Sequence, residues 1–199
     1  MTQPIVYVVD DDLDLGLSLA RLLRRQGYAT ESFVEPRQVL DVYQDAPAHC
    51  VVTDVMMDDL DGFAFAEKLR ALDPAVSIVF MTAWPTTAHA VDSIRRYGGL
   101  DYLEKPLDQD RLLAAMAEGT AWSEARRASA SRIAPLTRRE REVFDFLVRG
   151  YSNKAIANAL GVSVKTIEDH RASVIAKTGA KSVADLVRLV EDMGTARRP

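Results

Sequence analysis

Residues 50–62, CVVTDVMMDDLDG, join a short apolar run to a cluster of aspartates. The apolar run ends at Asp54, and Asp58, Asp59 and Asp61 follow within the next seven positions. A continuous apolar run of this length is typical of a strand buried on both faces of a parallel sheet. Acidic residues in a turn are usually only solvated, so any chemistry at Asp54 depends on the side chains that other strands bring to it.

Similar runs recur along the first half of the chain. They are IVYVV (5–9), SIVFM (77–81) and DYL (101–103), with the alternating ATESF (29–33) as a weaker strand. Between them lie helical patterns such as LGLSLARLLRR (15–25), in which leucines recur at three- and four-residue steps. Strands that alternate with helices predict an α/β domain with a doubly wound, parallel, five-stranded sheet.

The charge of the chain is distributed unevenly. Residues 1–120 hold 20 acidic and 10 basic side chains, whereas residues 121–199 hold 9 and 15, within a net charge of −4. An acidic half followed by a basic half favours two domains with different partners, the second of them nucleic acid. After residue 106 the pattern is only helical. We therefore expect a domain over 1–121, a partly helical linker over 122–135, and a small all-α domain of four helices over 136–199.

The composition excludes several classes of protein. No apolar run approaches the roughly 18–20 residues that span a bilayer, so we expect no membrane partner. The N-terminal MTQPIVYVVD has neither a basic start nor a cleavage site and predicts a strand, not a signal peptide. The single cysteine, Cys50, excludes an intramolecular disulfide and indicates a reducing, cytoplasmic location.

Polar side chains follow the apolar strands at their carboxyl ends, where doubly wound sheets bind ligands. Asp10 and Asp11 end the first strand, Asp54 the third and Thr82 the fourth, and the fifth runs into Lys105. Carboxylates so close together repel one another, and hard oxygen ligands suit Mg²⁺. A carboxylate there can attack a phosphoryl group, while the metal and the lysine neutralise charge and the threonine hydroxyl bonds the new phosphate.

The motifs VVDDD, TDVMMDDLDG, MTA and DYLEKP, in this order, resemble the receiver domain of two-component response regulators over residues 1 to about 120. The resemblance implies phosphorylation by a sensor histidine kinase, and no enzymatic activity beyond Mg²⁺-dependent self-phosphorylation and self-dephosphorylation. It also implies a cis bond before Pro106. The residues that it implies are the phospho-acceptor Asp54, the Mg²⁺ ligands Asp10, Asp11, Asp54 and the backbone carbonyl of Met56, and the switch residues Thr82, Tyr102 and Lys105.

Two features depart from the pattern of that family. Asp58 stands four positions after the acceptor, where the family usually has proline, and AWPTTAHAVDS (83–93) lacks the common glycine-histidine start. These departures affect phosphate lifetime and the motion of the loop after Thr82. We expect Asp58, Asp59 and Asp61 to form a solvated turn.

The basic half contains short helices separated by glycine-containing turns. Thr137 with Glu140 three residues later predicts a capping box that opens the first helix. Gly161 allows a tight turn after a second helix, and Ser163 caps a third. This order describes a helix-turn-helix, whose second helix enters the major groove, although the same spacing also occurs in plain helix bundles.

Two strings, LTRREREVF (136–144) and GYSNKAIANALGVSVKTIEDHRASVIAK (150–177), resemble the LuxR-type output domain of the FixJ/NarL-like branch of response regulators. The resemblance implies binding to double-stranded DNA, as a homodimer on phosphorylation. Periodicity places four residues in the core, Val164, Ile167, Val174 and Ile175. Arg171 lies near that face, where it packs and pairs with the first helix or contacts a phosphate. The opposite face presents Lys165, Glu168, Asp169, Ala172 and Ser173 to base edges, and the phosphate candidates are Lys154, Lys165, Thr166 and Lys177.

These features predict a phosphorylation-controlled transcriptional regulator, with two alternatives open. One is an aspartate-nucleophile phosphatase, since Asp10-Asp11-Asp12 contains the D-x-D of haloacid-dehalogenase-like enzymes, with Asp10 as nucleophile. The lack of a cap domain and of a late acidic pair argues against it. The other is a DNA- or protein-binding module that acts without phosphorylation.

Overall fold

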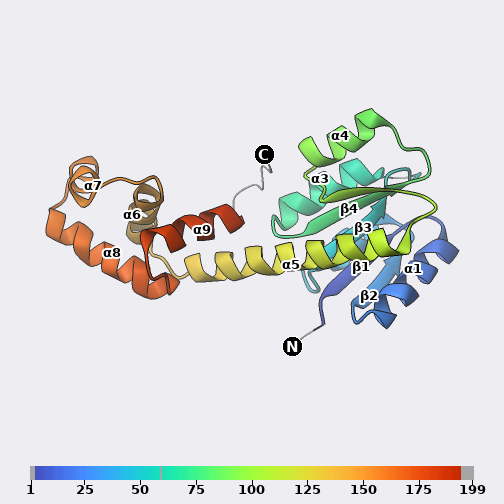
Figure 1. Ribbon diagram of the computed structural model, residues 1–199, viewed down its shortest axis with the longest axis horizontal. Helices are drawn as coiled ribbons and strands as arrows, with labels where there is room; N and C mark the ends of the chain where they lie inside the picture. Colours follow the sequence, from blue (N-terminus) through green and yellow to red (C-terminus); the bar gives the residue numbers. More distant parts are fainter. Residues whose placement is uncertain (1–2, 59, 194–199) are drawn as a thin grey trace. The chain divides into compact units, whose positions relative to one another are not determined.

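The structure is a computed structural model that describes residues 3–58 and 60–193 (Figure 1). The chain divides into two compact units, Met1–Glu124 and Ala125–Pro199. None of the helices in the described residues is long and apolar enough to cross a bilayer.

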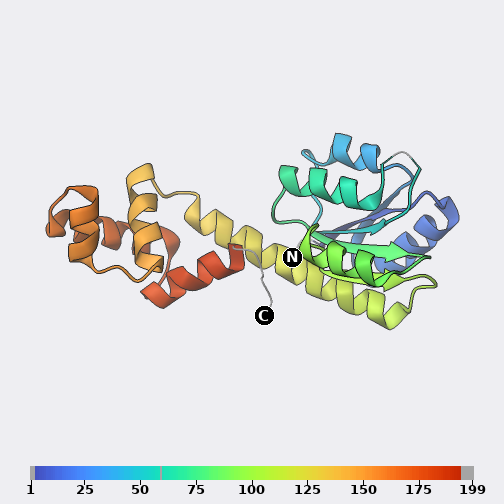
Figure 2. The ribbon, with the colours of Figure 1, turned by 90° about the horizontal axis from the view of Figure 1, so that it is seen from above.

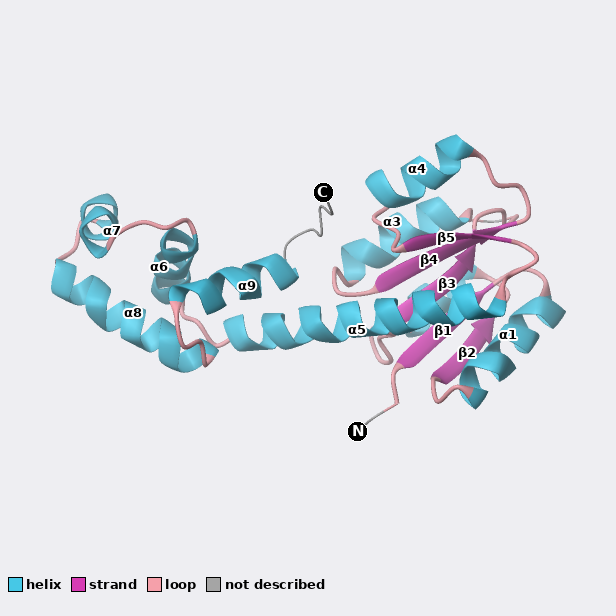
Figure 3. Ribbon diagram, in the orientation of Figure 1, coloured by secondary structure: helices cyan, strands magenta, loops and turns pink. Residues whose placement is uncertain are grey.

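The first unit is built on a parallel sheet with strand order β2-β1-β3-β4-β5 (Figure 3). Its strands are β1 (Ile5–Val9), β2 (Ala29–Phe33), β3 (Cys50–Asp54), β4 (Ser77–Thr82) and β5 (Asp101–Glu104). Its helices are α1 (Leu13–Arg25), α2 (Pro36–Val42), α3 (Gly62–Leu72), α4 (Thr87–Arg95) and α5 (Gln109–Ile133). The predicted doubly wound α/β fold with five parallel strands is confirmed.

Helices cover both faces of this sheet (Figure 2). On one face, Leu19 and Leu23 of α1 and Leu112 and Met116 of α5 pack against inward residues of β1, β3 and β4. On the other face, the core contains Val39 of α2 and Phe65 and Leu69 of α3. Strands β3 and β4 are buried along their whole length, as the continuous apolar runs predicted.

The register of the strands brings their carboxyl ends to one edge. Val9 pairs with Thr53, Asp54 with Met81, and Thr82 with Glu104. The strand order reverses between β1 and β3, and doubly wound sheets bind ligands at the carboxyl ends of the strands beside such a switch point. The acidic residues after β1 and β3 therefore lie on either side of the switch point.

The second unit is all-α, as predicted. It contains α6 (Arg138–Val148), α7 (Asn153–Leu160), α8 (Val164–Thr178) and α9 (Val183–Met193). Thr137 and Glu140 form the predicted capping box, Ser163 caps α8, and Gly161 has a φ of 66° at the turn between α7 and α8. The four helices enclose a core that includes Val143, Phe144, Leu147, Ile156, Ile167, Val174, Leu186 and Leu189.

The segment expected as a partly helical linker belongs to α5, which continues to Ile133. The end of this helix is part of the second unit, because Ile133 is buried in its core. Ser129 Oγ donates to Asp192 of α9 over 3.1 Å, and Arg132 Nε donates to the carbonyl oxygen of Thr178 over 2.7 Å. Arg132 thereby satisfies a carbonyl at the end of α8 that has no partner within that helix.

Candidate functional site

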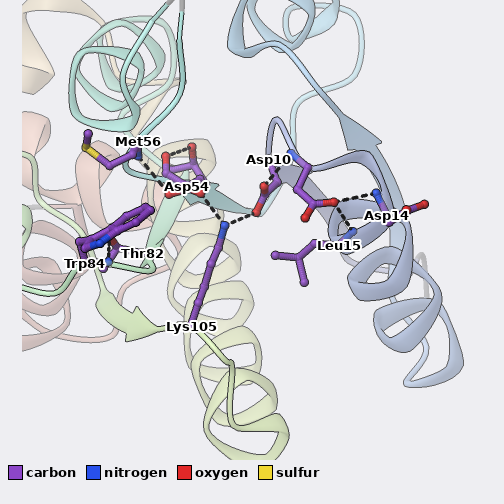
Figure 4. A network of polar contacts seen from close by, with 10 residues as sticks. Asp10, Asp14, Leu15, Asp54, Met56, Thr82, Trp84 and Lys105 are labelled. Carbon is purple, nitrogen blue, oxygen red and sulfur yellow. Dashed lines mark hydrogen bonds and ion pairs between the residues drawn. The ribbon is translucent and has the colours of Figure 1, made fainter.

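Lys105 lies between two buried carboxylates at the carboxyl edge of the sheet (Figure 4). Its Nζ is 2.7 Å from Asp10 Oδ2 and 2.5 Å from Asp54 Oδ2. Asp10 has no exposed surface, and Asp54 is only 6% exposed. The peptide bond between Lys105 and Pro106 is cis, and the Lys105 N–H donates to the carbonyl of Thr82.

The three acids from the ends of β1 and β3 form a potential metal site. Carboxylate oxygens of Asp10, Asp11 and Asp54 lie within 4.8 Å of one another, and Asp11 is exposed to solvent. Three carboxylates and one ammonium leave an excess of negative charge in a small volume. Hard carboxylate oxygens with access to water are a donor set that suits a hard divalent cation such as Mg²⁺.

Burial, hydrogen bonds and charges in this cluster shift two pKa values. Burial raises the pKa of Asp10, and the charge of Asp54 adds to this effect, although Lys105 and the Asp12 N–H oppose it. Burial alone would lower the pKa of Lys105, but the hydrogen bonds and charges of Asp10 and Asp54 outweigh it, so this pKa is raised. Lys105 is therefore an ammonium at neutral pH.

The backbone after Asp54 holds the second oxygen of its carboxylate. The Met56 N–H donates to Asp54 Oδ1 over 3.0 Å, and the Met56 side chain is exposed. Gly62 at the start of α3 allows this turn to close, because a Cβ there would lie 2.1 Å from the carbonyl oxygen of Asp54. A larger residue at Gly62 would push α3 away from the end of β3.

The hydroxyl groups of Thr82 and Tyr102 are buried beside this cluster. Thr82 Oγ1 accepts a hydrogen bond from the Trp84 N–H over 3.1 Å, so its own proton is available to an incoming oxygen. The Tyr102 hydroxyl lies near Thr82 and the Thr86 backbone, but forms no hydrogen bond of good geometry within the described residues. Burial raises its pKa. The Trp84 side chain is largely exposed.

Other acids near the site cap helices or face solvent. Asp12 is itself the N-cap of α1, and its Oδ1 accepts from the N–H groups of Asp14 and Leu15. Asp61 is the N-cap of α3 and accepts from Ala64, so it is more than part of a solvated turn. Asp58 is exposed, and Asp59 lies outside the described residues.

The second unit presents an exposed polar face on α8. Lys165, Glu168, Asp169 and Ala172 are exposed, whereas Ile167 and Val174 on the other side of the helix are buried. Lys165 Nζ lies 3.1 Å from Asp169 Oδ1, one helical turn away. Lys154, in the first turn of α7, is also exposed.

Glu140 of α6 binds two α8 side chains that the sequence suggested for DNA. Ser173 Oγ donates to Glu140 Oε1 over 2.5 Å, and Lys177 Nζ lies 2.6 Å from Glu140 Oε2. The Thr137 N–H also donates to Oε2. Lys177 foremost, together with Ser173 and the Thr137 N–H, lowers the pKa of Glu140 to about 2. In the sequence the only signal for this role was the capping box.

Three further details of the second unit correct or refine expectations. Arg171 Nη1 donates to Asn153 of α7 over 3.2 Å, instead of pairing with the first helix of the domain. Val164 is 42% exposed and is not a core residue, because it occupies the first helical position of α8. The Thr166 hydroxyl lies 2.8 Å from Ser163 Oγ, in the same turn.

Comparisons with known proteins match each unit to a family. Residues 6–117 match the response regulator receiver domain, and residues 134–190 match the luxR family of bacterial regulatory proteins. The chain is 38% identical to the transcriptional regulatory protein FixJ of Bradyrhizobium diazoefficiens over 97% of both chains. It is 35% identical to the C4-dicarboxylate transport transcriptional regulatory protein DctR of Rhodobacter capsulatus, over 92% of this chain and 98% of that protein.

Two solved structures resemble the whole chain. Full-length FixJ from B. japonicum is 35% identical, with a TM-score of 0.55 and coverage of 98% of both chains. The response regulator StyR is 32% identical, with a TM-score of 0.56 and coverage of 96% of this chain and 99% of that chain.

Proposed function

Because the chain belongs to the response regulators that join a receiver domain to a LuxR-type output domain, we propose that a phosphoryl group on Asp54 controls its binding to DNA. One observation carries the proposal. The Asp54 carboxylate lies among Lys105, Asp10 and Asp11 at the switch point of the sheet. An isolated aspartate in a turn would have no such surroundings.

In the proposed reaction, Asp54 is the nucleophile. Its carboxylate attacks the phosphorus of a phosphohistidine on a sensor histidine kinase, the phosphorus–nitrogen bond breaks, and the histidine leaves with the electron pair and takes up a proton. Lys105 pairs with the oxygens of the transferred group, and Thr82 donates its hydroxyl proton to one of them. Asp10, Asp11, Asp54 and the Met56 carbonyl would hold Mg²⁺, which supplies charge neutralisation when bound. Apart from Mg²⁺-dependent self-phosphorylation and self-dephosphorylation, the protein is not an enzyme.

The phosphorylated state differs from the unphosphorylated state in the positions of the Thr82 and Tyr102 side chains. Once Thr82 turns to the phosphoryl group, Tyr102 rearranges beside it and changes the face formed by α4 and β5, at about residues 86–111. That face pairs with a second copy, so that two output domains meet two half-sites on DNA. The phosphoryl group shifts this equilibrium only by its differential stabilisation, and a shift from 1:99 to 99:1 requires about 5.5 kcal/mol.

Residues 136–199 form the proposed DNA-binding domain, and residues 122–135 connect it to the receiver domain at residues 1–121. Glu168, Asp169 and Ala172 on the exposed face of α8 meet base edges, and a carboxylate there accepts from a cytosine amino group. Lys154, Lys165 and Thr166 contact phosphates. Ser173 and Lys177 could reach DNA only by leaving Glu140, so we assign them to the orientation of α8. This function places the protein in the cytoplasm.

The first test is the intact mass of the full chain after incubation with acetyl phosphate and Mg²⁺. We expect one phosphoryl addition to the wild type, none to Asp54→Asn, and one to Asp58→Asn, the matched control from the exposed part of the same loop. An addition that persists in Asp54→Asn would refute the assignment of the acceptor. Turnover of phosphate esters that Asp10→Asn abolishes and Asp54→Asn retains would favour the phosphatase alternative.

A second measurement addresses the output. We expect duplexes selected from a random pool to bind more tightly after phosphorylation, with an affinity that falls as salt increases. Equal affinity in both states would favour the module that binds DNA without phosphorylation.

A further inference from the structure

Each lysine and arginine of α8 contacts an oxygen of the protein itself. Lys165 pairs with Asp169 on the same helix, Arg171 donates to Asn153, and Lys177 pairs with Glu140. Of these partners, Asp169 alone lies on the exposed face that is proposed to meet DNA. The other two contacts hold α8 against α7 and α6, so only the Lys165–Asp169 pair can be exchanged for contacts with DNA without loss of packing.

The exposed face of α8 is consequently not a positive surface. Lys165 is its single lysine, Glu168 and Asp169 are both acidic residues, and the three side chains together have a formal charge of −1. Phosphate contacts give rise to most of the affinity of non-specific DNA binding, through release of counterions from the duplex. A lysine that is already neutralised by an adjacent carboxylate contributes little to this release. An α8 of this composition therefore disfavours duplexes of arbitrary sequence.

We propose that Asp169 determines specificity by exchanging Lys165 for a base. This inference rests on the proposed DNA-binding function. At a matching site, Asp169 accepts a hydrogen bond from the amino group of a cytosine or an adenine in the major groove, and Lys165 then turns to a backbone phosphate. At any other site, Lys165 can reach a phosphate only by leaving the Asp169 carboxylate uncompensated near the polyanion. Base recognition and phosphate contact are thereby coupled.

The strength of the Lys165–Asp169 pair is compatible with such an exchange. Both side chains are exposed, at 78% and 67%, and exposed pairs are weak and readily broken. The lysine precedes the carboxylate by four residues, which is the less favourable orientation in a helix. The pair therefore opens when both members find better partners. Repulsion between a released Asp169 and phosphates, not the pair itself, opposes binding at other sequences.

Salt-dependent binding of the full chain to a random-sequence duplex tests the proposal. We expect Asp169→Asn to tighten this binding by about three- to tenfold near 0.1 M salt, and to steepen the slope of log K against log salt by about 0.9, because Lys165 gains one phosphate. Asp145→Asn is the matched control, since Asp145 is an exposed aspartate on α6 and its replacement changes the net charge equally. For the duplex selected by the wild type, we expect the preference over random sequence to fall at least about threefold in Asp169→Asn.

A double variant separates exchange from simple charge repulsion. In a Lys165→Gln background, Asp169→Asn should leave the salt slope unchanged. An equal gain in Asp145→Asn, or a steeper slope that persists without Lys165, would overturn the exchange. Failure of the phosphorylated wild type to bind any duplex would overturn the proposed function, and this inference with it.

Discussion

The two units each contain a buried carboxylate paired with a lysine, and the two pairs have opposite electrostatic character. Asp10 and Lys105 lie 2.7 Å apart in the receiver domain, and Glu140 and Lys177 lie 2.6 Å apart in the output domain. The pKa of Asp10 is raised, whereas the pKa of Glu140 is lowered to about 2. A short contact to a lysine therefore does not determine whether a carboxylate is stabilised.

The surroundings of each pair explain the difference. Among the described residues, no second carboxylate competes with Glu140 for Lys177, and Glu140 also accepts hydrogen bonds from Ser173 and from the Thr137 backbone. Asp10 is completely buried and shares Lys105 with Asp54, whose charge repels its own. The output domain thus stabilises the charge of the Glu140 carboxylate, whereas the receiver domain keeps an excess of negative charge around Asp10. Such unfavourable electrostatics is common at sites that bind a cation or react, because function and not stability has shaped them.

The largest change in stability should follow from removal of the Glu140 carboxylate. We expect Glu140→Ala to lower the Tm of the output domain by about 4–8 °C. The reason is that Ser173, Lys177 and the capping box lose a shared partner. Differential scanning calorimetry would measure the Tm, and amide hydrogen exchange of α6 and α8 would locate the loss of stability. Glu142→Ala on the same helix is the control, because Glu142 pairs with Arg138 and Arg139 at a more exposed position. Equal losses in both variants would contradict the special role of Glu140.

Lowering the pH should change the stability of the two domains in opposite directions, and the expected effect is smaller than that of Glu140→Ala. Because the pKa of Glu140 is lowered from 4.5 to about 2, its contribution to stability is fully present above pH 4.5 and is lost as the pH falls towards 2. Asp10 acts in the opposite direction: its raised pKa means that the cost of burying its charge disappears as the pH falls towards 3.8.

Amide exchange between pH 4.5 and 2.5 would follow both domains. We expect protection of α6 and α8 to fall more steeply in the wild type than in Glu140→Gln, which lacks the titrating group. Fluorescence of Trp84 and Trp122, which both lie in the first unit, reports the receiver domain separately. A steeper loss in the variant would contradict the assigned direction of the Glu140 shift.

The smallest expected effect is a gain in stability. Asp10→Asn removes a buried charge whose ionisation the folded state disfavours, so we expect the receiver domain to become more stable at pH 7, by about 0.5–2 kcal/mol. Phosphorylation by acetyl phosphate should decline in the same variant. Urea denaturation followed by tryptophan fluorescence would measure the stability, with Asp41→Asn on α2 as an exposed control. A clear loss of stability would mean that the Lys105 contact outweighs the burial of Asp10.

The sequence predicted the sheet and the gathering of its terminal residues well. Strand ends are marked by acidic residues after an apolar run, as at Asp10 after residues 5–9 and at Asp54 shortly after residues 50–52, and parallel topology brings such ends together. For residues 122–135 the sequence predicted a linker that is partly helical; it did not predict that α5 continues without a break to Ile133, because this segment has no regular apolar stripe. Its fixed position depends on Thr178 and Asp192, which are 46 and 63 residues away from their partners Arg132 and Ser129.

The faces of α8 were predicted only in part for the same reason. Helical periodicity correctly separated Ile167 and Val174 from Glu168 and Asp169. It gave no indication that Ser173 and Lys177 bind Glu140, since these contacts join residues 33 and 37 positions apart. Side chains on the border between two faces are decided by the neighbouring helix, and the sequence pattern of one helix does not contain that information.

The distance along the chain between the acids and Lys105 also matters during synthesis. Lys105 is 95 residues from Asp10 and 51 residues from Asp54. At 5–20 residues per second, the ribosome needs about 3–10 s to add Lys105 after Asp54. During that interval the nascent chain has all three carboxylates of the cluster but lacks Lys105, the lysine that pairs with two of them. A truncated chain that ends before β5 would retain Asp54 but lack Lys105, so only a chain translated past residue 105 can pair these carboxylates with their lysine.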